Sequence, residues 1–446
     1  MKILVLNGSP AGENSITLYT VKYIQKHFPS CSFEVLHVGQ RIRAFEKDFS
    51  ACEKALAGAE LILFSYPVYT FLVPAQLHRF IELMKEHNAD VRGKFATQIS
   101  TSKHFYDVTA HRFIEENCAD LGLRYIKGLS ADMDDLLTEQ GRKEALDFFS
   151  FVLWSIQNNI CEPSPLPTTA AKAAVPEETD APEVVEKTDK RAVIVADYDP
   201  DAPSDAPLTA LIGRFRAALP MRSDVVNIRE FPFAGGCLGC FRCASTGKCV
   251  YKDRFDDYLR TNIQSADALV YAYTIRDHSM GYRFKLFDDR QFCNGHRTVT
   301  MGKPVGYLVS GDLDAEPNLR MLMESRAQVG GNFLAGIADS PAAVGKVALT
   351  LAYAAEHGYE PPKDFYGVGG LKIFRDLIYQ MQGLMREDHR FYKKHGFYDF
   401  PQKRRGRIVG MYAVGAMMNN EKLRKKAGAM MTEGMVMPYK KVLEKY

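Results

Sequence analysis

The stretch MKILVLNGSPAGENSITLYTVKYIQKHF, residues Met1–Phe28, indicates the fold class of this chain. A short apolar run at Lys2–Leu6 predicts a buried strand, and the spacing of apolar residues from Ser15 to His27 predicts an amphipathic helix. The loop between them consists of small and hydroxylic residues. A buried strand that leads through a tight loop into a helix is the first unit of an α/β fold with a parallel sheet.

The same alternation continues to residue 160. Further helices are predicted at Pro74–His87 and Gly141–Asn158. Further strands are predicted at Phe33–Val38, Glu60–Ser65, Lys94–Ser100 and Arg124–Leu129. We therefore predict that residues 1–160 form a doubly wound domain with helices on both faces of a parallel sheet.

A segment of different composition follows this domain. Residues 161–190 contain five prolines and almost no large apolar side chains, which predicts an extended linker. Strands are then predicted at Arg191–Ala196, Val225–Ile228, Ala268–Tyr273, Val305–Val309 and Phe333–Ala335. The spacing from the third to the fourth strand is nearly equal in the two halves. We therefore predict two such domains in tandem, the second over residues 191–370 with a cysteine-bearing insertion after its second strand.

The composition excludes several classes of protein. With 446 residues, 46 % hydrophobic and 25 % charged, the chain is neither disordered, collagen-like nor a coiled coil. Its longest uncharged apolar stretch, Leu61–Leu77, is interrupted by two prolines and is short for a membrane span. The apolar run at the N-terminus is too short for a secretory signal. We therefore expect a cytoplasmic protein without a membrane span.

The C-terminal segment is basic and rich in methionine. Residues 371–446 hold 17 Lys and Arg against 7 Asp and Glu. We predict a helical extension that packs on a more acidic body, and the alternative is a surface for an anionic partner. Nucleic acid is not expected, because no recognised binding motif accompanies the charge. The glycine-rich stretch Gly367–Gly370 predicts a turn.

Three loops of the first half carry candidate ligand-binding residues. The loop Asn7–Thr17 suits a phosphate, because backbone N–H groups and hydroxyls at a helix N-terminus bind dianions. It is neither a Walker loop nor a GxGxxG loop, and simple N-capping by Ser15 or Thr17 is the alternative. The loops Ser65–Phe71 and Ser100–Tyr106 follow the third and fourth strands, whose carboxyl ends lie beside that of the first strand at the switch point. Together they predict a site for a flat ring with a phosphate tail.

The pattern GSP-x-x-x-x-S-x-T, followed by PVY and PAQL, resembles the NADPH-dependent FMN reductase family of flavodoxin-like proteins over about residues 1–155. The resemblance implies a flavodoxin-like fold, FMN as cofactor and NAD(P)H as an electron donor. Where many members carry an arginine after Ser-Pro, this chain has Ala11, which removes one cation from the phosphate. The implied FMN-binding residues are Ser9, Pro10, Asn14, Ser15 and Thr17 at the phosphate, Pro67, Val68, Tyr69, Thr70 and Phe71 along the ring edge, and Thr101, Ser102, Lys103, His104 and Tyr106 over the other side of the ring.

The second half lacks these features. Its first-strand loop, Ala196–Asp201, holds three carboxylates where a phosphate would sit, and like charges repel. Its third-strand loop lacks the Pro-Val-Tyr sequence. We therefore predict a degenerate flavodoxin-like domain that does not hold FMN.

The second half carries a cysteine cluster that the first half does not have. Cys237, Cys240, Cys243 and Cys249 are spaced C-x2-C-x2-C-x5-C, whereas zinc sites usually combine two more distant C-x2-C pairs. Four thiolates suit a [4Fe-4S] cluster. This spacing within a flavodoxin-like domain resembles the iron–sulfur flavoproteins of anaerobic microbes, and the resemblance implies that the four cysteines ligate such a cluster. Flavin reductases without a cluster carry a similar loop, so a cluster-free loop stays an alternative, as do zinc and disulfides.

These features predict a redox flavoprotein that transfers electrons between FMN and a [4Fe-4S] cluster. Such an oxidoreductase couples a one-electron carrier such as ferredoxin to a two-electron donor or acceptor. The first alternative is an NAD(P)H-dependent reductase of FMN, quinones or nitro or azo compounds with structural cysteines, and the second is a redox-sensing module. No side chain is expected to be catalytic. The tether favours an intramolecular pseudo-dimer of the two halves, with a homodimer as the alternative.

Overall fold

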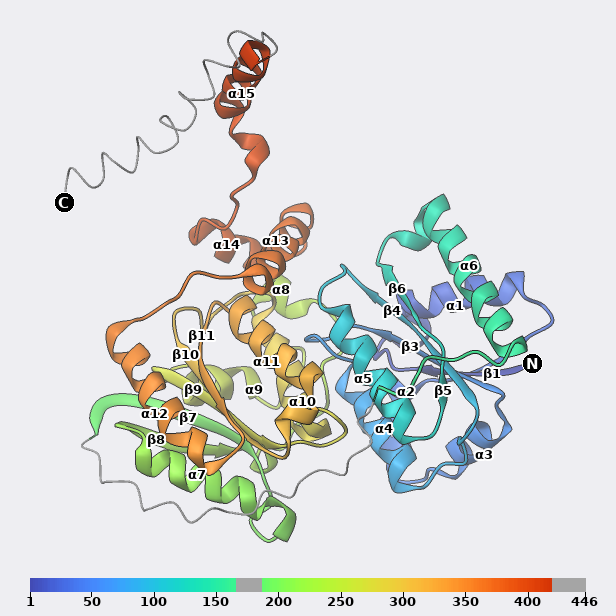
Figure 1. Cartoon of the computed structure of the whole chain (residues 1–446), viewed down its shortest axis with the longest axis horizontal. Helices are drawn as coiled ribbons and strands as arrows, with labels where there is room; N and C mark the ends of the chain where they lie inside the picture. The colour runs from blue at the N-terminus through green and yellow to red at the C-terminus, as the bar shows by residue number, and fades with distance from the viewer. Residues whose placement is uncertain (166–186, 419–446) are drawn as a thin grey trace. The chain divides into compact units, whose positions relative to one another are not determined.

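The computed structural model describes residues 1–165 and 187–418 (Figure 1). The chain divides into two compact units, residues 1–391 and 392–446. Both sheets belong to the first unit. The described part of the second unit contains the end of α14 (Arg386–Lys394) and helix α15 (Arg405–Met418).

The first half contains a parallel sheet in the order β2-β1-β3-β4-β5, with β6 paired to β4. This is the strand order of a flavodoxin-like doubly wound fold. The predicted fifth strand is divided into two short strands, because the chain leaves the sheet between them. The strands are β1 (Lys2–Asn7), β2 (Ser32–Leu36), β3 (Leu61–Pro67), β4 (Phe95–Ser102), β5 (Arg124–Tyr125) and β6 (Leu129–Asp132).

Helices cover both faces of this sheet because its central strands are apolar on both sides. Ile3 and Val5 pack with α1 and α6 on one face, while Leu4 and Leu6 pack with α2 to α5 on the other. The helices are α1 (Ile16–His27), α2 (Val38–Phe45), α3 (Ser50–Gly58), α4 (Ala75–Glu86), α5 (Asp107–Asp120) and α6 (Glu139–Gln157).

The second half contains a parallel sheet of the equivalent order, β8-β7-β9-β10-β11. The shared order agrees with two flavodoxin-like domains, and the tandem duplication itself stays a prediction. The strands are β7 (Thr188–Asp197), β8 (Met221–Asn227), β9 (Ala268–Thr274), β10 (Pro304–Ser310) and β11 (Phe333–Ala338). The helices are α7 (Ala206–Ala218), α8 (Arg242–Thr246), α9 (Phe255–Tyr258), α10 (Gly281–Arg290), α11 (Pro317–Val329) and α12 (Pro341–His357).

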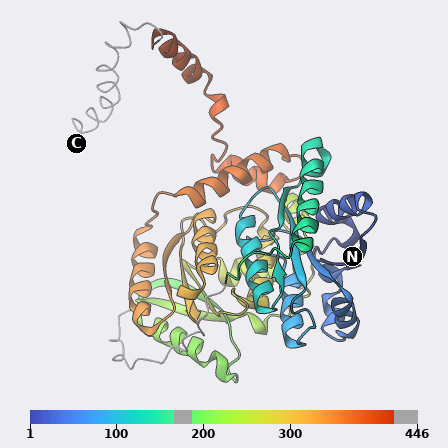
Figure 2. The ribbon, with the colours of Figure 1, turned by 45° about the vertical axis from the view of Figure 1, so that its right-hand side comes forward.

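The two halves pack on each other within the first unit, as Figure 2 shows. Helix α4 contacts α10, and α5 contacts α11. One continuous hydrophobic core includes Phe64 and Phe113 of the first half and Tyr273 and Leu322 of the second. The carboxyl ends of both sheets therefore approach one another around this core.

Helix α13 (Phe365–Gln380) lies on the second half beside α11. The predicted boundary between residues 370 and 371 falls inside this helix. The predicted turn at Gly367–Gly370 is wrong, because these glycines form part of the first turns of α13. A Cβ at Gly370 would lie 2.6 Å from Val329 Cγ2 and 2.9 Å from Phe105 Cε2, so glycine allows close packing on both halves. Most of the predicted linker, residues 166–186, lies outside the described residues.

Candidate functional site

A cavity of about 490 Å³ lies inside the first unit and is lined by both halves. This volume is in the range of small-molecule sites, about 300–1,000 Å³. The first half contributes the loops that follow β1, β3 and β4. The second half contributes the cysteine loop, the strands β9 and β10, and the helices α10 and α11.

The loop after β1 forms one end of the cavity. Ser15 is the N-cap of α1, and its hydroxyl accepts a hydrogen bond from the backbone N–H of Leu18 at 3.3 Å. The hydroxyls of Thr17 and Thr101 are hydrogen-bonded to each other and are buried. The first N–H groups of a helix have no partner within the helix. Hydroxyls and a helix N-terminus therefore meet at a position that suits a phosphate.

The loop after β3 is held in an uncommon conformation. Thr70 and Phe71 have φ of 43° and 72°, in the left-handed region that non-glycine residues seldom adopt. The N–H groups of Tyr69 and Leu72 donate to each other's carbonyl oxygens at 2.8 and 3.0 Å. The ammonium of Lys285, from α10 of the second half, donates to the Tyr69 carbonyl at 2.9 Å. The second half therefore helps to fix the loop that we predicted along the ring edge.

Only some of the FMN-binding residues predicted in the loop after β4 line the cavity. Thr101, Ser102 and Lys103 line the cavity. The Lys103 ammonium donates to Asp132 at 2.7 Å and to Asp134 at 2.6 Å. Partial desolvation lowers the pKa of Lys103, but these two bonds outweigh it, so the pKa is raised overall. The charge of Lys103 is therefore shared with two carboxylates.

Three predicted FMN-binding residues do not line the cavity: Pro10, His104 and Tyr106. His104 is exposed, has a positive φ of 51° and binds Asp107 at 3.1 Å. The Tyr106 ring lies behind Phe71, with ring centroids 4.4 Å apart. The other predicted positions all line the cavity, namely Ser9, Asn14, Ser15, Thr17, Pro67, Val68, Tyr69, Thr70, Phe71, Thr101, Ser102 and Lys103.

The cysteine loop lies in the same cavity wall, and Cys237, Cys240, Cys243 and Cys249 all line the cavity. The backbone of the loop is tied to the rest of the second half. Arg290 donates to the Gly235 carbonyl at 2.8 Å, Tyr251 to the Gly236 carbonyl at 3.0 Å and Arg260 to the Gly247 carbonyl at 2.7 Å. These bonds fix both ends of the loop and leave its sulfur atoms at the cavity.

The four thiols of the loop do not form a compact mononuclear metal site in the described part of the chain. All four are free of disulfides. Zn–S bonds of about 2.3 Å in a tetrahedron place the sulfurs about 3.8 Å apart. No three of the four sulfurs lie within 4.8 Å of one another in the described part of the chain. Burial raises the pKa of Cys243 to about 11 and also raises that of Cys237, so binding of a metal by these thiols would release protons.

The two candidate cofactor loops touch each other. The carbonyl of Cys237 accepts a hydrogen bond from the Gln76 amide at 3.4 Å, and Gln76 belongs to α4 of the first half. A Cβ at Gly239 would lie 2.0 Å from the Tyr69 hydroxyl oxygen. The loop predicted for the flavin ring and the loop predicted for the metal cluster are therefore neighbours within one chain.

Arginines from neighbouring segments of the second half pair with the carboxylates in and near its acidic loop. Arg229 binds Asp197 at 2.7 Å and Asp199 and Asp205 at 3.3 Å, and Arg276 binds Asp205 at 2.7 Å. Residues 197–201 do not line the cavity. The arginines and carboxylates satisfy one another at the place where the first half has its hydroxylic loop.

The sequence alone did not predict the wall that the second half adds. Tyr271, Tyr273 and Tyr307 line the cavity from β9 and β10, and Arg326 of α11 pairs there with Asp288 of α10. The Arg326 guanidinium also lies 5.4 Å from the centre of the Phe71 ring. No local motif marks these residues, because only the packing of the two halves brings them to the cavity.

Comparison with known proteins supports the first-half assignment. Residues 1–111 match the NADPH-dependent FMN reductase family. The chain is also similar to an iron–sulfur flavoprotein of Archaeoglobus fulgidus, with 25 % identity over 174 residues that cover 36 % of this chain and 79 % of the relative. These matches support an FMN-dependent oxidoreductase.

Solved structures similar to parts of this chain include two FMN complexes. General stress protein 14 of Treponema denticola shares 11 % identity with a TM-score of 0.28, over 34 % of this chain and 98 % of its own. An FMN-dependent NADH-azoreductase of Bacillus anthracis shares 13 % identity with a TM-score of 0.27, over 34 % of this chain and 98 % of its own. Within the described residues, none of the helices combines the length and the apolar character that a membrane crossing requires.

Proposed function

We propose that the first half binds one FMN, that the second half binds one [4Fe-4S] cluster through Cys237, Cys240, Cys243 and Cys249, and that electrons pass between the two inside one chain. The observation that carries this proposal is the single cavity lined by the strand-end loops of the first half and by all four cysteines of the second. FMN exchanges two electrons or one at a time, whereas an iron–sulfur cluster exchanges one.

The residues of the chain would position the cofactors in this scheme. Ser9, Asn14, Ser15 and Thr17 would hold the phosphate, and Pro67–Phe71 the ring edge. The direct contact of Tyr69 with Gly239 keeps the two loops together and favours a short path for electrons. The second half then takes the place that a partner subunit has in a dimer, so the pseudo-dimer is internal.

The donor and acceptor belong to this proposal as well. We propose NAD(P)H or a ferredoxin-like carrier on one side and a small redox-active molecule on the other, in the cytoplasm, where free thiols such as these stay reduced. The second candidate function is an NAD(P)H-dependent reductase of quinones or of nitro or azo compounds with structural cysteines. The bonds that tie the cysteine-loop backbone to Arg290, Tyr251 and Arg260 favour it, because they fix the loop without any metal.

A cofactor analysis of the full chain, purified without oxygen, separates the two functions. We expect about one FMN, four iron and four sulfide per chain, with a broad iron–sulfur absorption beneath the flavin bands. Flavin with iron well below one per chain would favour the second function. Two FMN per chain would contradict the assignment of the acidic loop at residues 197–201.

A further inference from the structure

Helix α10 of the second half clamps a loop of the first half with a buried ion pair. The ammonium of Lys285 pairs with Asp289 one helical turn away and donates to the Thr70 hydroxyl at 2.5 Å. Asp289 also accepts the backbone N–H of Ala75 at 2.8 Å. Lys285 and Asp289 are completely buried, and the ammonium satisfies the polar groups around it.

Helix α4 of the first half makes the reciprocal contact with a loop of the second half. Four pairs of positions, with one residue in each half, have the same separation along the chain. The pairs are His78 and Lys285, Glu82 and Asp289, Thr70 and Asp277, and Ala75 and Tyr282. The backbone N–H of Tyr282 donates to Glu82 at 2.8 Å, as that of Ala75 does to Asp289. Asp277 has φ of 52°, close to the 43° of Thr70. The two contacts are therefore equivalent in the two halves.

The two contacts differ in charge. Where the first has the Lys285 ammonium, the second has the imidazole of His78, which is completely buried. Neither ring nitrogen of His78 has a hydrogen-bond partner, although buried polar atoms normally have one. Burial of an imidazole without hydrogen-bond partners favours its neutral form, so this contact lacks the cation that Lys285 supplies to the first one.

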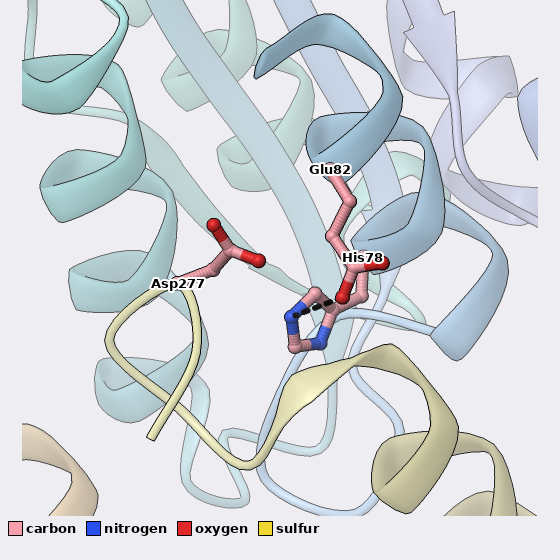
Figure 3. A group of neighbouring side chains, drawn as sticks. All are labelled: His78, Glu82 and Asp277. Atoms are coloured by element: carbon pink, nitrogen blue, oxygen red, sulfur yellow. Dashed lines mark ion pairs between the residues drawn. The ribbon is translucent and has the colours of Figure 1, made fainter. Parts of the chain in front are cut away.

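Two carboxylates face this neutral ring. Figure 3 shows the carboxylates of Glu82 and Asp277 turned toward the imidazole of His78. His78 Nε2 lies 3.8 Å from Glu82 Oε1, too far for a hydrogen bond. One ligand atom from each of the three residues lies within 4.8 Å of the others. The arrangement has the donors of a metal site.

We propose that a divalent transition-metal ion, with Zn²⁺ as the representative, binds between the two halves through His78, Glu82 and Asp277, in the place that the Lys285 ammonium takes in the equivalent contact. An imidazole nitrogen with two carboxylate oxygens is a donor set that zinc accepts, with a water as fourth ligand. The nitrogen disfavours Mg²⁺ and Ca²⁺, which prefer oxygen ligands. The ion would join α4 to the loop after β9 and so clip the halves together.

The existing contacts of the carboxylates leave room for this ion. Lys85 binds one Asp277 oxygen at 2.8 Å, and Arg79 binds Glu82 Oε2 at 3.0 Å. Each carboxylate oxygen can accept more than one bond, so these contacts do not use up the ligand capacity. Glu82 Oε1, the oxygen nearest His78, also accepts the backbone N–H of Tyr282, and its second lone pair stays available to the ion.

The test compares zinc binding by the full chain and by variants of the site. After dialysis against ZnCl₂ and removal of loose metal, we expect His78→Lys to hold one zinc fewer per chain than the unmodified protein. Zinc should raise the thermal unfolding midpoint of the unmodified protein by more than it raises that of His78→Lys. Without zinc, His78→Lys should unfold at the same temperature or higher, because its ammonium restores the equivalent of Lys285.

Two further variants serve as a second test of the site and as its control. Glu82→Gln keeps the size of the side chain, removes one charged ligand and should lose the same zinc, which keeps the test valid if His78→Lys does not fold. His357→Gln, at an exposed histidine of α12, should keep the zinc of the unmodified protein. All four proteins retain the four cysteines. Zinc bound by these cysteines therefore contributes equally to the zinc content of each protein and does not affect the difference between them. Equal zinc in all four proteins, or a thermal shift as large with Mg²⁺ as with Zn²⁺, would overturn the proposal.

Discussion

A Cβ added to Gly239 would lie 2.0 Å from the hydroxyl oxygen of Tyr69, closer than any real Cβ contact. Gly239 belongs to the cysteine loop and has φ of 61°, a conformation in which glycine is strongly preferred. Tyr69 belongs to the loop after β3 of the other half. The two loops can approach this closely only because residue 239 has no side chain.

Gly239→Ala should therefore separate the two loops. We expect a loss of about 1 kcal/mol from the left-handed backbone alone, and slower electron exchange between flavin and iron because Tyr69 must move. The measurements are urea unfolding and stopped-flow absorption after partial reduction. Gly213→Ala is the matched control, since a Cβ there meets no atom within 4 Å and lies in helix α7, where alanine is favoured. Equal exchange rates in both variants would show that this contact does not matter for transfer.

Thr17→Val should weaken the binding of FMN without changing the binding of riboflavin. The substitution keeps the volume of the buried side chain and removes the hydroxyl at the N-terminus of α1. The loss of one hydrogen bond to a charged phosphate costs about 1.5–3 kcal/mol, which corresponds to a Kd roughly 10- to 100-fold higher. Titrations with both flavins measure it. An equal loss for riboflavin, which has no phosphate, would contradict the position of the phosphate.

Lys285→Met should destabilise the protein strongly. It leaves the Asp289 carboxylate buried without its ammonium partner, which typically costs about 3–5 kcal/mol. The double variant Lys285→Met with Asp289→Leu removes both charges and should recover much of this loss. Urea unfolding of the three proteins compares them. If the double variant is as unstable as the single one, the ion pair acts mainly through its bonds to Tyr69 and Thr70.

Replacing any one of the four cysteines of the loop by serine should lower iron and sulfide together and leave FMN nearly unchanged. The matched control is Cys293→Ala. Cys293 is buried and lines the same cavity, but it lies outside the C-x2-C-x2-C-x5-C pattern. Iron, sulfide and flavin contents give the answer. A loss of iron in Cys293→Ala comparable to that in Cys249→Ser would point to a different set of ligands.

The unfolding free energy should fall as the pH drops from about 6.5 to 4, partly because of His111. Burial lowers the pKa of His111 to about 4, and its Nε2 lies 2.8 Å from the Ser100 hydroxyl. Below the ordinary histidine pKa of about 6.5 the unfolded chain gains a proton that the folded chain does not bind, so unfolding is favoured by at most about 3 kcal/mol. His111→Gln should flatten this part of the pH profile, measured by urea unfolding. An unchanged slope would exclude His111 as its source.

Much of the fold follows from local sequence patterns. The apolar runs at Lys2–Leu6 and Glu60–Ser65 correspond to β1 and β3, and Pro74–His87 corresponds to α4. Such runs are readable because strands buried on both faces are continuously apolar and helices repeat every 3.6 residues. The glycines of α13 misled the prediction, because their close packing on Val329 and Phe105 outweighs their low helix propensity.

Local patterns were sufficient to predict the two sheets and to identify the hydroxylic loop at Ser9–Thr17 and the four spaced cysteines as candidate binding sites. Each of these features depends on residues that are neighbours along the chain. The packed structure was needed to establish that these loops share one cavity, that Tyr271 and Arg326 complete its wall, that His104 turns outward, and that His78 faces Asp277 across the two halves. These contacts depend on how two separately patterned halves pack together. Packing is set by the shape of whole surfaces, which no short stretch of sequence contains.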